Sequence, residues 1–245
     1  MDQLIITCEH AGNDVPEAYR PLFVGHAHLL PTHRGWDPGA LLLAREMAAR
    51  FAAPLHHGTT TRLLVDLNRS VGAPDLHSEV SRHLPPGERR SLLAAHYHPH
   101  RRAVLAAVAA AVDRGDRVVH IASHSFTPQL DGVVRAVDIG LLYDPARPGE
   151  VAFCDAWLAA LAARDAGLRL RRNHPYRGTG DGLTKALRRL HPPERYVGIE
   201  LEVNQRFVAG GGTEWPRIRQ VVVDTLGTVL GGAGQLRGMS GTGAG

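Results

Sequence analysis

Histidine and carboxylate side chains follow three apolar runs of this sequence, in an arrangement suited to hydrolytic chemistry. His10 comes just after the first run, His124 just after the second, and Glu202 just after the third. The runs are residues 4–8, 118–122 and 196–201. Open α/β sheets bind ligands just outside the carboxyl ends of their strands, so these side chains should meet at one rim. Two imidazoles and a carboxylate at one rim are the side chains that a hydrolytic zinc site requires.

A third metal ligand should be a carboxylate or another histidine. Asp37 is the best candidate, and His33 and Glu9 are the alternatives. Asp37 also precedes Pro38, and an aspartate before a proline is a good N-cap for a helix. The sequence therefore leaves two roles open for Asp37, metal ligand or helix cap.

Glu200 and Glu202 lie two residues apart in an apolar run, so in a strand both side chains point to the same face. Two carboxylates on one face are costly to bury unpaired, so one of them should be functional or matched to a cation. Glu202 lies nearer the carboxyl end of the strand, where a general base for water attack is needed. The alternative is an exposed edge strand.

Two polar segments could recognise a substrate. Asn68 and Arg69 place an amide beside a guanidinium, whose planar fork suits a carboxylate. A surface salt bridge is the common alternative for this pair. Residues 173–182 are rich in glycine and polar side chains, which predicts a long loop. Such loops are often functional, and a plain connector is the alternative.

Three histidines around Pro99 look like a metal-binding tract. His96, His98 and His100 have a period of two, which fits no single helical face. Pro99 also restricts the backbone of the residue before it. We interpret these histidines as helix-start and surface residues.

Strand and helix patterns alternate along the chain, which predicts a mainly parallel sheet with helices on both faces. Expected strands cover residues 3–8, 54–58, 117–122, 137–143, 168–171 and 196–203, with a possible further strand at 61–67. Expected helices cover residues 40–52, 87–114, 149–164, 182–190 and 214–230. The fold class is a single three-layer α/β domain over residues 1–230, with a mixed, mainly parallel sheet. The glycine-rich segment 231–245 cannot bury enough apolar surface and is predicted to be a flexible tail.

Composition narrows the class of protein and of partner. Of the 245 residues, 44% are hydrophobic and 21% charged, as in ordinary globular proteins. No apolar stretch approaches the roughly 20 residues of a membrane helix, and no targeting segment opens the chain, so we expect a cytoplasmic protein. Two cysteines exclude a disulfide framework. The net charge of +4 with only 5% aromatic residues favours a small anionic substrate over nucleic acid.

Taken together, the motifs resemble those of the N-formylglutamate amidohydrolase family. They occur in the family's order and span nearly the whole folded part of the chain. The matching stretches are CEHAGNDVP (8–16), HRGWDPGA (33–40), LVDLNRS (64–70), HYHPHR (96–101), HSFTP (124–128), DIGLLYDP (138–145), YRGTGDGLT (176–184) and GIELEVNQ (198–205). Two positions depart from family members that act in histidine degradation, namely Glu9, where those carry proline, and Glu200, where those carry glutamine.

The resemblance implies a fold like that of zinc carboxypeptidases and aspartoacylases, with one zinc ion. By position it implies metal ligands at His10, Asp37 and His124, a catalytic glutamate at Glu202, a carboxylate clamp at Asn68 and Arg69, and a second substrate-binding and catalytic cation at Arg177. The implied reaction is hydrolysis of the amide bond of an N-acyl amino acid such as N-formylglutamate. Zinc would polarise the acyl oxygen and activate water, with Glu202 as the base.

Two other functions are compatible with the same residues. A carboxypeptidase-like peptidase would use the clamp on a peptide C-terminus, and a non-catalytic protein of this fold would only bind a carboxylate. The departures at Glu9 and Glu200 leave the acyl group and the amino acid of the substrate open. No sequence feature indicates the oligomeric state.

Overall fold

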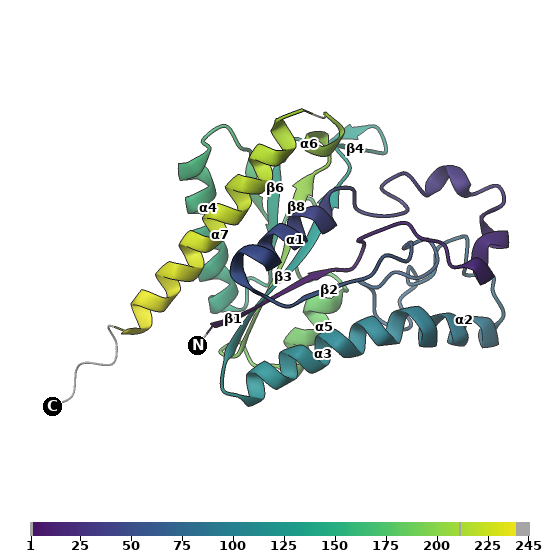
Figure 1. Ribbon diagram of the computed structural model, residues 1–245, viewed down its shortest axis with the longest axis horizontal. Coiled ribbons are helices and arrows are strands. Elements are labelled where there is room, and N and C mark those ends of the chain that lie inside the picture. Colours follow the sequence, from purple (N-terminus) through teal and green to yellow (C-terminus); the bar gives the residue numbers. More distant parts are fainter. Residues whose placement is uncertain (1, 211, 239–245) are drawn as a thin grey trace.

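A six-stranded sheet forms the centre of the protein, with strand order β2-β1-β3-β8-β6-β7 (Figure 1). The computed structural model describes residues 2–210 and 212–238. The strands of the sheet are β1 (Asp2–Cys8), β2 (Leu55–His57), β3 (Arg117–Phe126), β6 (Ile139–Leu142), β7 (Leu170–Arg172) and β8 (Tyr196–Asn204). A separate two-stranded hairpin pairs β4 (Gln129–Leu130) with β5 (Val133–Val134).

The sheet is mixed and mainly parallel, as predicted. Neighbouring strands from β2 through β1 and β3 to β8 are all parallel. β6 pairs antiparallel with β8, and β7 is parallel to β6. The carboxyl ends of β1, β3 and β8 therefore meet at one edge of the sheet, where their polar residues are found.

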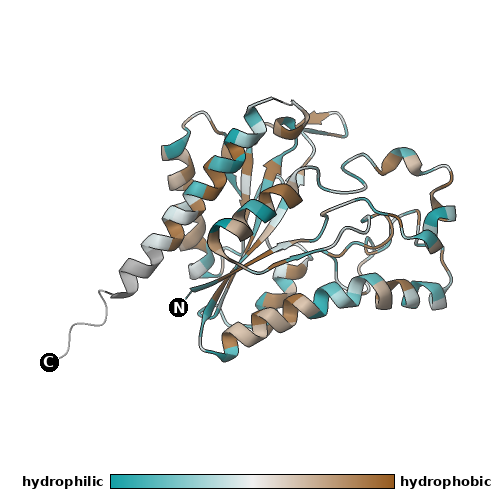
Figure 2. Cartoon of the chain, in the orientation of Figure 1, coloured by the Kyte–Doolittle hydropathy of each residue, from teal (hydrophilic) through white to brown (hydrophobic). Residues whose placement is uncertain are grey.

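Helices cover both faces of the sheet (Figure 1), which confirms the predicted three-layer α/β fold. One face packs against α1 (Ala40–Phe51), α4 (Pro148–Arg164) and α7 (Glu214–Gly238), and the other against α3 (His98–Asp113) and α5 (Leu183–Leu190). Shorter helical segments are α2 (Pro86–Leu92), α6 (Arg206–Ala209), a π-helical turn at Leu93–Tyr97, and 3-10 turns at Glu17–Phe23 and Ala27–Leu29. Figure 2 shows hydrophobic and hydrophilic residues alternating along these helices, as expected for amphipathic helices on a sheet.

Successive side chains of β8 point to opposite faces of the sheet, so core residues lie on one face and the two glutamates on the other. Val197, Ile199 and Leu201 belong to the core under α1, α4 and α7. Glu200 and Glu202 therefore point to the opposite face, the one that α3 and α5 cover. α5 begins only at Leu183, so the carboxyl-end part of that face is open to a cavity.

Several element boundaries differ from the sequence-based expectations. β3 continues to Phe126, so His124 lies within the strand and not after it. α7 continues to Gly238, past the predicted end at residue 230, and the rest of the predicted tail, 239–245, lies outside the described residues. The expected helix at 87–114 is interrupted by the π-helical turn between α2 and α3.

The prediction of a possible strand at 61–67 is wrong. These residues form turns, and their apolar side chains pack into a small separate core with Phe23, Leu76 and Val80. That core lies in the loop lobe, the region of residues 11–39 and 58–85 beyond the carboxyl ends of β1 and β2 (Figure 1). The apolar run is buried, as its composition indicates, but it has no neighbouring strand to pair with.

A buried ion cluster ties α4 and α5 to the sheet. Glu150 is fully buried and lies 3.0 Å from the Arg188 guanidinium and 3.3 Å from that of Arg147. Arg188 also donates hydrogen bonds to the carbonyl oxygens of Gly178 and Gly198. The cluster therefore anchors β8 and the loop at 173–182.

None of the helices in the described ranges has the length and apolar character needed to cross a membrane.

Glu150→Gln is expected to lower the free energy of unfolding by about 3–5 kcal/mol, because two buried guanidiniums lose their counter-charge. Urea denaturation followed by circular dichroism measures this loss. The matched control is Glu46→Gln, whose partner Arg219 lies 2.9 Å away on a half-exposed pair, and which should cost at most about 1 kcal/mol. Equal losses in the two variants would contradict this account of the cluster.

Candidate metal and substrate site

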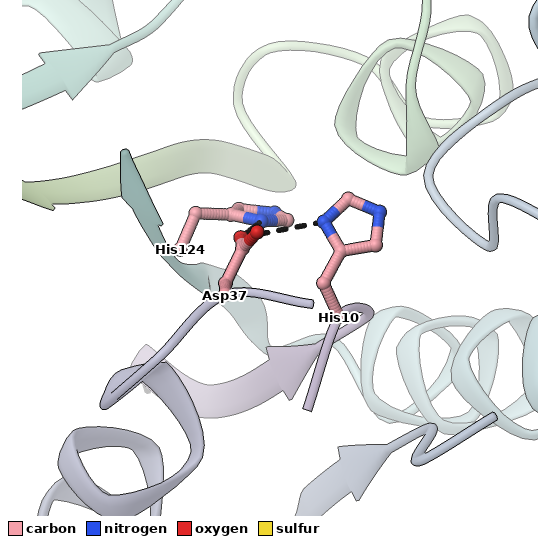
Figure 3. A group of neighbouring side chains, drawn as sticks. All are labelled: His10, Asp37 and His124. Atoms are coloured by element: carbon pink, nitrogen blue, oxygen red, sulfur yellow. Dashed lines mark hydrogen bonds and ion pairs between the residues drawn. The ribbon is translucent and has the colours of Figure 1, made fainter. Parts of the chain in front are cut away.

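His10, Asp37 and His124 converge at the carboxyl edge of the sheet, as their sequence positions predicted. Each offers one ligand atom, and these atoms lie within 4.8 Å of one another. Asp37 Oδ2 lies 2.9 Å from His124 Nδ1 and 3.3 Å from His10 Nδ1 (Figure 3). All three side chains are buried. Among the described residues, this is the group of histidine and carboxylate side chains that could hold a metal ion.

Asp37 does not cap the helix that follows it. The residue before α1 is Gly39, and no side chain caps the helix by a hydrogen bond. Gly39 has a φ of 84°, which glycine adopts at little cost and which turns the chain from Asp37 into α1. The Asp37 carboxylate instead faces the two imidazoles, so the cap role considered for Asp37 is wrong.

Each imidazole has a second carboxylate behind it. His10 Nε2 hydrogen-bonds to Asp66 Oδ1 at 2.7 Å, and His124 Nε2 lies 3.1 Å from Glu9 Oε2. A carboxylate at Nε2 favours the tautomer with the proton on Nε2. The lone pairs of both Nδ1 atoms then point at the negatively charged Asp37 Oδ2. Such a set of donors is favourable only around a cation, so the residues present fit a metal ion.

The charges of this group perturb one another strongly. Burial alone would raise the pKa of Asp37, but the neighbouring His10 and His124 lower it well below its ordinary value. Burial alone would lower the pKa of His124, but Asp37 and Glu9 raise it well above its ordinary value. Without a metal ion, positive charge on His124 therefore stabilises the carboxylates of Asp37 and Glu9.

Arg62 joins two of the buried carboxylates. Its guanidinium lies 3.4 Å from Asp37 Oδ1 and 2.7 Å from Asp66 Oδ2. Burial would raise the pKa of Asp66, but Arg62 and His10 hold it well below its ordinary value. Arg62 thus partly neutralises the group through Asp37 Oδ1, while Asp37 Oδ2 contacts the two imidazoles.

Glu202 lies beside the ligand group. It is directly opposite His124 in the β3–β8 register, and it is buried with Oε2 lacking any hydrogen bond to the described residues. Burial raises the pKa of Glu202 to about 8, with Asp37 and Glu200 adding to the rise and His124 opposing it. A carboxyl of this kind, next to a cavity, has the properties of a general acid or base.

A cavity of about 340 Å³ opens over these residues and includes the predicted substrate-binding side chains. Its lining residues are His10, Asp37, Arg62, Asn68, Arg69, Asp75, His124, Ser125, Tyr176, Arg177, Gly180, Asp181, Glu200 and Glu202. Asn68 Oδ1 accepts a hydrogen bond from the backbone N–H of Leu183 at 2.7 Å. This bond leaves the amide nitrogen of Asn68 available to donate to a ligand.

Arg69 is partly engaged within the protein. Its Nε donates to Asp75 Oδ2 at 2.5 Å and its Nη1 to the Asn68 carbonyl at 2.9 Å. The surface salt bridge considered for this position is therefore present, and the guanidinium nevertheless lines the cavity. The pair with Asp75 leaves Nη2 without a bond to the described residues.

The loop at 173–182 is ordered and brings Arg177 to the cavity. Asn173 Oδ1 accepts hydrogen bonds from the backbone N–H groups of Tyr143 and Gly178. A Cβ at Gly178 would lie 2.1 Å from the Tyr143 nitrogen, so only glycine permits this contact. The Asp181 carboxylate accepts from both the backbone and the hydroxyl of Ser70. The exposed Arg177 side chain makes no hydrogen bond or ion pair to the described residues.

Two of the alternatives considered for the third ligand lie outside the ligand group. His33 lines an adjoining cavity, and Glu9 lies behind His124.

The interpretation of His100 as a surface residue is wrong, since its side chain is 6% exposed and its Nε2 is 3.7 Å from Glu9 Oε1. His100 lies four residues before Val104 and eight before Val108, so it shares the face of α3 that packs against the sheet.

The sequence analysis also missed Asp66 and Arg62. The sequence LVDLNRS contains Asp66, but its role depends on the turn that folds it back beneath His10. Arg62 is four residues earlier, a spacing that suggests a helical ion pair, whereas these residues form turns. An acid among apolar residues, Leu64 to Leu67, was the available signal that Asp66 is buried for a reason.

Fold and site together define an α/β protein with a candidate metal centre and a charged cavity at the carboxyl ends of a mixed sheet. The sequence model of the N-formylglutamate amidohydrolase family matches residues 2–209. The chain belongs to this family, which confirms the resemblance, and the protein is an N-formylglutamate amidohydrolase-like hydrolase.

Two solved structures are similar over nearly the whole chain. Gene product Atu2144 from Agrobacterium tumefaciens has 31% sequence identity and a TM-score of 0.80, over 94% of this chain and 91% of that one. An N-formylglutamate amidohydrolase from Ralstonia eutropha JMP134 has 20% identity and a TM-score of 0.69, over 94% of each chain. The second structure supports the fold. A search of the curated proteins found no match to this chain.

Asp66→Asn is expected to weaken metal binding about 10- to 100-fold, because a neutral amide holds the Nε2-protonated tautomer of His10 less firmly than a carboxylate does. Competition with a chelating dye measures the affinity. The control is Glu79→Gln, which removes the counter-charge of Arg34 in the loop lobe and should leave the affinity unchanged. Identical affinities of Asp66→Asn and the wild type would exclude this positioning role.

Glu202→Gln is expected to stabilise the metal-free protein more at pH 8 than at pH 5. The folded state holds a proton on Glu202 up to about pH 8, whereas the unfolded chain releases it near 4.5, so wild-type stability falls as the pH rises through this window. The gain at pH 8 should be on the order of 1–3 kcal/mol. Thermal unfolding after chelation measures it, with the exposed Glu194→Gln as control. A gain that does not change with pH would contradict the buried, protonated carboxyl.

Proposed function

We propose that the protein is a zinc-dependent amidohydrolase that cleaves the linear amide bond of an N-acyl amino acid, with N-formyl amino acids among its substrates. Catalytic zinc is commonly held by two imidazole nitrogens and one carboxylate oxygen, with a further position open to water or substrate. His10, Asp37 and His124 would hold it. At this position the ion would polarise the acyl carbonyl and make water a stronger acid.

One observation carries the proposal. The His10 imidazole has the buried Asp66 carboxylate behind it, and the His124 imidazole has the buried Glu9 carboxylate behind it. A third carboxylate, Asp37, lies between the two rings. The unpaired, buried Glu202 lies opposite His124 and faces the same cavity. A ligand group, a candidate base and a set of cations for a carboxylate therefore line a single cavity.

The chain's own residues would do the rest of the chemistry. Glu202 would take a proton from the attacking water and return it to the leaving amine. A metal ion held by His10, Asp37 and His124 would add positive charge beside Glu202. That charge would lower the pKa of Glu202 from about 8 toward the neutral range, where the carboxylate can act as a base. The amide nitrogen of Asn68, together with Arg69 and Arg177, would hold the substrate carboxylate and so orient the scissile amide.

The purified protein is expected to contain about one zinc ion per chain and to lose hydrolysis of N-formyl amino acids after chelation. Glu202→Gln should retain the metal and lose about 10²–10⁴-fold in kcat, as expected for removal of a general base. Elemental analysis and steady-state kinetics measure the two effects. Arg69→Ala serves as the contrasting variant, since it should act mainly on KM.

Short peptides with a free C-terminus test the peptidase alternative in the same assay. Preference for peptides over N-acyl amino acids would replace the proposed reaction. Full activity after removal of all metal would exclude the proposed mechanism. Binding of N-acyl amino acids without turnover by the zinc-loaded protein would favour the carboxylate-binding alternative.

A further inference from the structure

Glu200 differs from every other carboxylate that lines the cavity. It is half-buried, and its Oε1 accepts one hydrogen bond, from the Thr184 hydroxyl at 2.9 Å. Its second oxygen makes no hydrogen bond to the described residues, and no lysine, arginine or histidine of these residues forms an ion pair with it. Because Glu200 lines the cavity, this oxygen is open to a ligand.

Each of the other carboxylates of the cavity has a partner or, for Glu202, a proposed role as the base. Asp37 lies between the imidazoles, Asp75 accepts from Arg69, and Asp181 accepts two hydrogen bonds from Ser70. Glu202 lies beside the ligand group, in the position of the base. Glu200 is thus an uncompensated negative charge in a cavity where the remaining charges have assigned partners or roles.

Glu200 lies near the predicted position of the substrate's amino acid. It is two residues from Glu202 on the same face of β8, a separation of roughly 7 Å at about 3.3 Å per residue. A Cβ at Gly182 would lie 2.9 Å from Asn68 Oδ1 and 3.2 Å from Glu200 Oε1, so the carboxylate is next to the clamp. A substrate held by Asn68 with its amide at Glu202 would therefore place its side chain within reach of Glu200.

We propose that Glu200 is a specificity-determining residue that selects N-acyl amino acids with a cationic side chain, an ammonium or a guanidinium. The inference rests on the proposed function, since it assigns a substrate class to the same cavity. A cation would neutralise Glu200 and form a charge-assisted hydrogen bond with its free oxygen. A second carboxylate on the substrate would instead be repelled there.

A purely structural role for Glu200 makes a different prediction. Its bond to the Thr184 hydroxyl lies in the first turn of α5 and ties that turn to β8. Glutamine keeps an acceptor oxygen of the same size, so Glu200→Gln preserves that role and removes only the charge. The charge and the helix contact can therefore be tested separately.

The experiment compares Nα-formyl-lysine, its uncharged analogue Nα-formyl-norleucine, and N-formylglutamate with the wild type, Glu200→Gln and Glu200→Lys. The wild type should prefer the lysine compound, and Glu200→Gln should lower the ratio of kcat/KM for lysine over norleucine by roughly tenfold or more. Glu200→Lys should shift the preference toward N-formylglutamate. Glu194→Gln, an exposed change of the same chemistry, should leave all three values unchanged.

Equal loss on all three substrates, or an unchanged lysine-to-norleucine ratio in Glu200→Gln, would overturn the proposal. Binding separates this failure from failure of the proposed function. Equilibrium dialysis of radiolabelled Nα-formyl-lysine and N-formylglutamate against the Glu202→Gln protein reports selectivity without turnover. Preferential binding of the lysine compound that is lost on adding Glu200→Gln supports the selectivity even when the wild type hydrolyses none of the three, and preferential binding of N-formylglutamate contradicts it.

Discussion

The imidazoles of His10 and His124 are each held between two carboxylates, and the rest of the site is arranged around this concentration of negative charge. Glu9, Asp37 and Asp66 are all almost fully buried, and Arg62 is the guanidinium that contacts two of them. Burying several carboxylates together is unfavourable unless cations compensate them. The arrangement therefore needs positive charge beside the carboxylates, from Arg62 together with a protonated His124 or from a metal ion between the imidazoles.

The sheet supplies one half of this site and the loop lobe supplies the other. β1 and β3 bring Glu9 and His124 together because the strands are parallel neighbours in register, and β8 adds Glu202 opposite His124. Asp66 and Arg62 come instead from turns whose apolar neighbours form their own small core. The geometry at His10 therefore depends on the packing of a lobe that has no strand of the central sheet.

This division explains how much the sequence could predict. His10, His124 and Glu202 follow apolar runs with a period that identifies strands, so their convergence at one edge followed from the topology of parallel sheets. Asp66 could not be placed in this way, because its position depends on a tertiary turn. His100 could have been placed, since it lies four residues before Val104 and eight before Val108 on the buried face of α3. The apolar run at 61–67 resembles a strand in sequence because it is buried, but it packs in the small core of the loop lobe.

The same face of β8 carries two glutamates whose surroundings assign them different properties. Glu202 lies beyond the start of α5 and next to the ligand group, where burial favours its neutral form until a positive charge arrives. Glu200 lies opposite the start of α5, less buried than Glu202 and with one oxygen accepting a hydrogen bond from the Thr184 hydroxyl. The helix start at Leu183 is what separates the two environments. A short helix on an otherwise continuous sheet face thus produces both a group suited to proton transfer and a fixed charge suited to recognition.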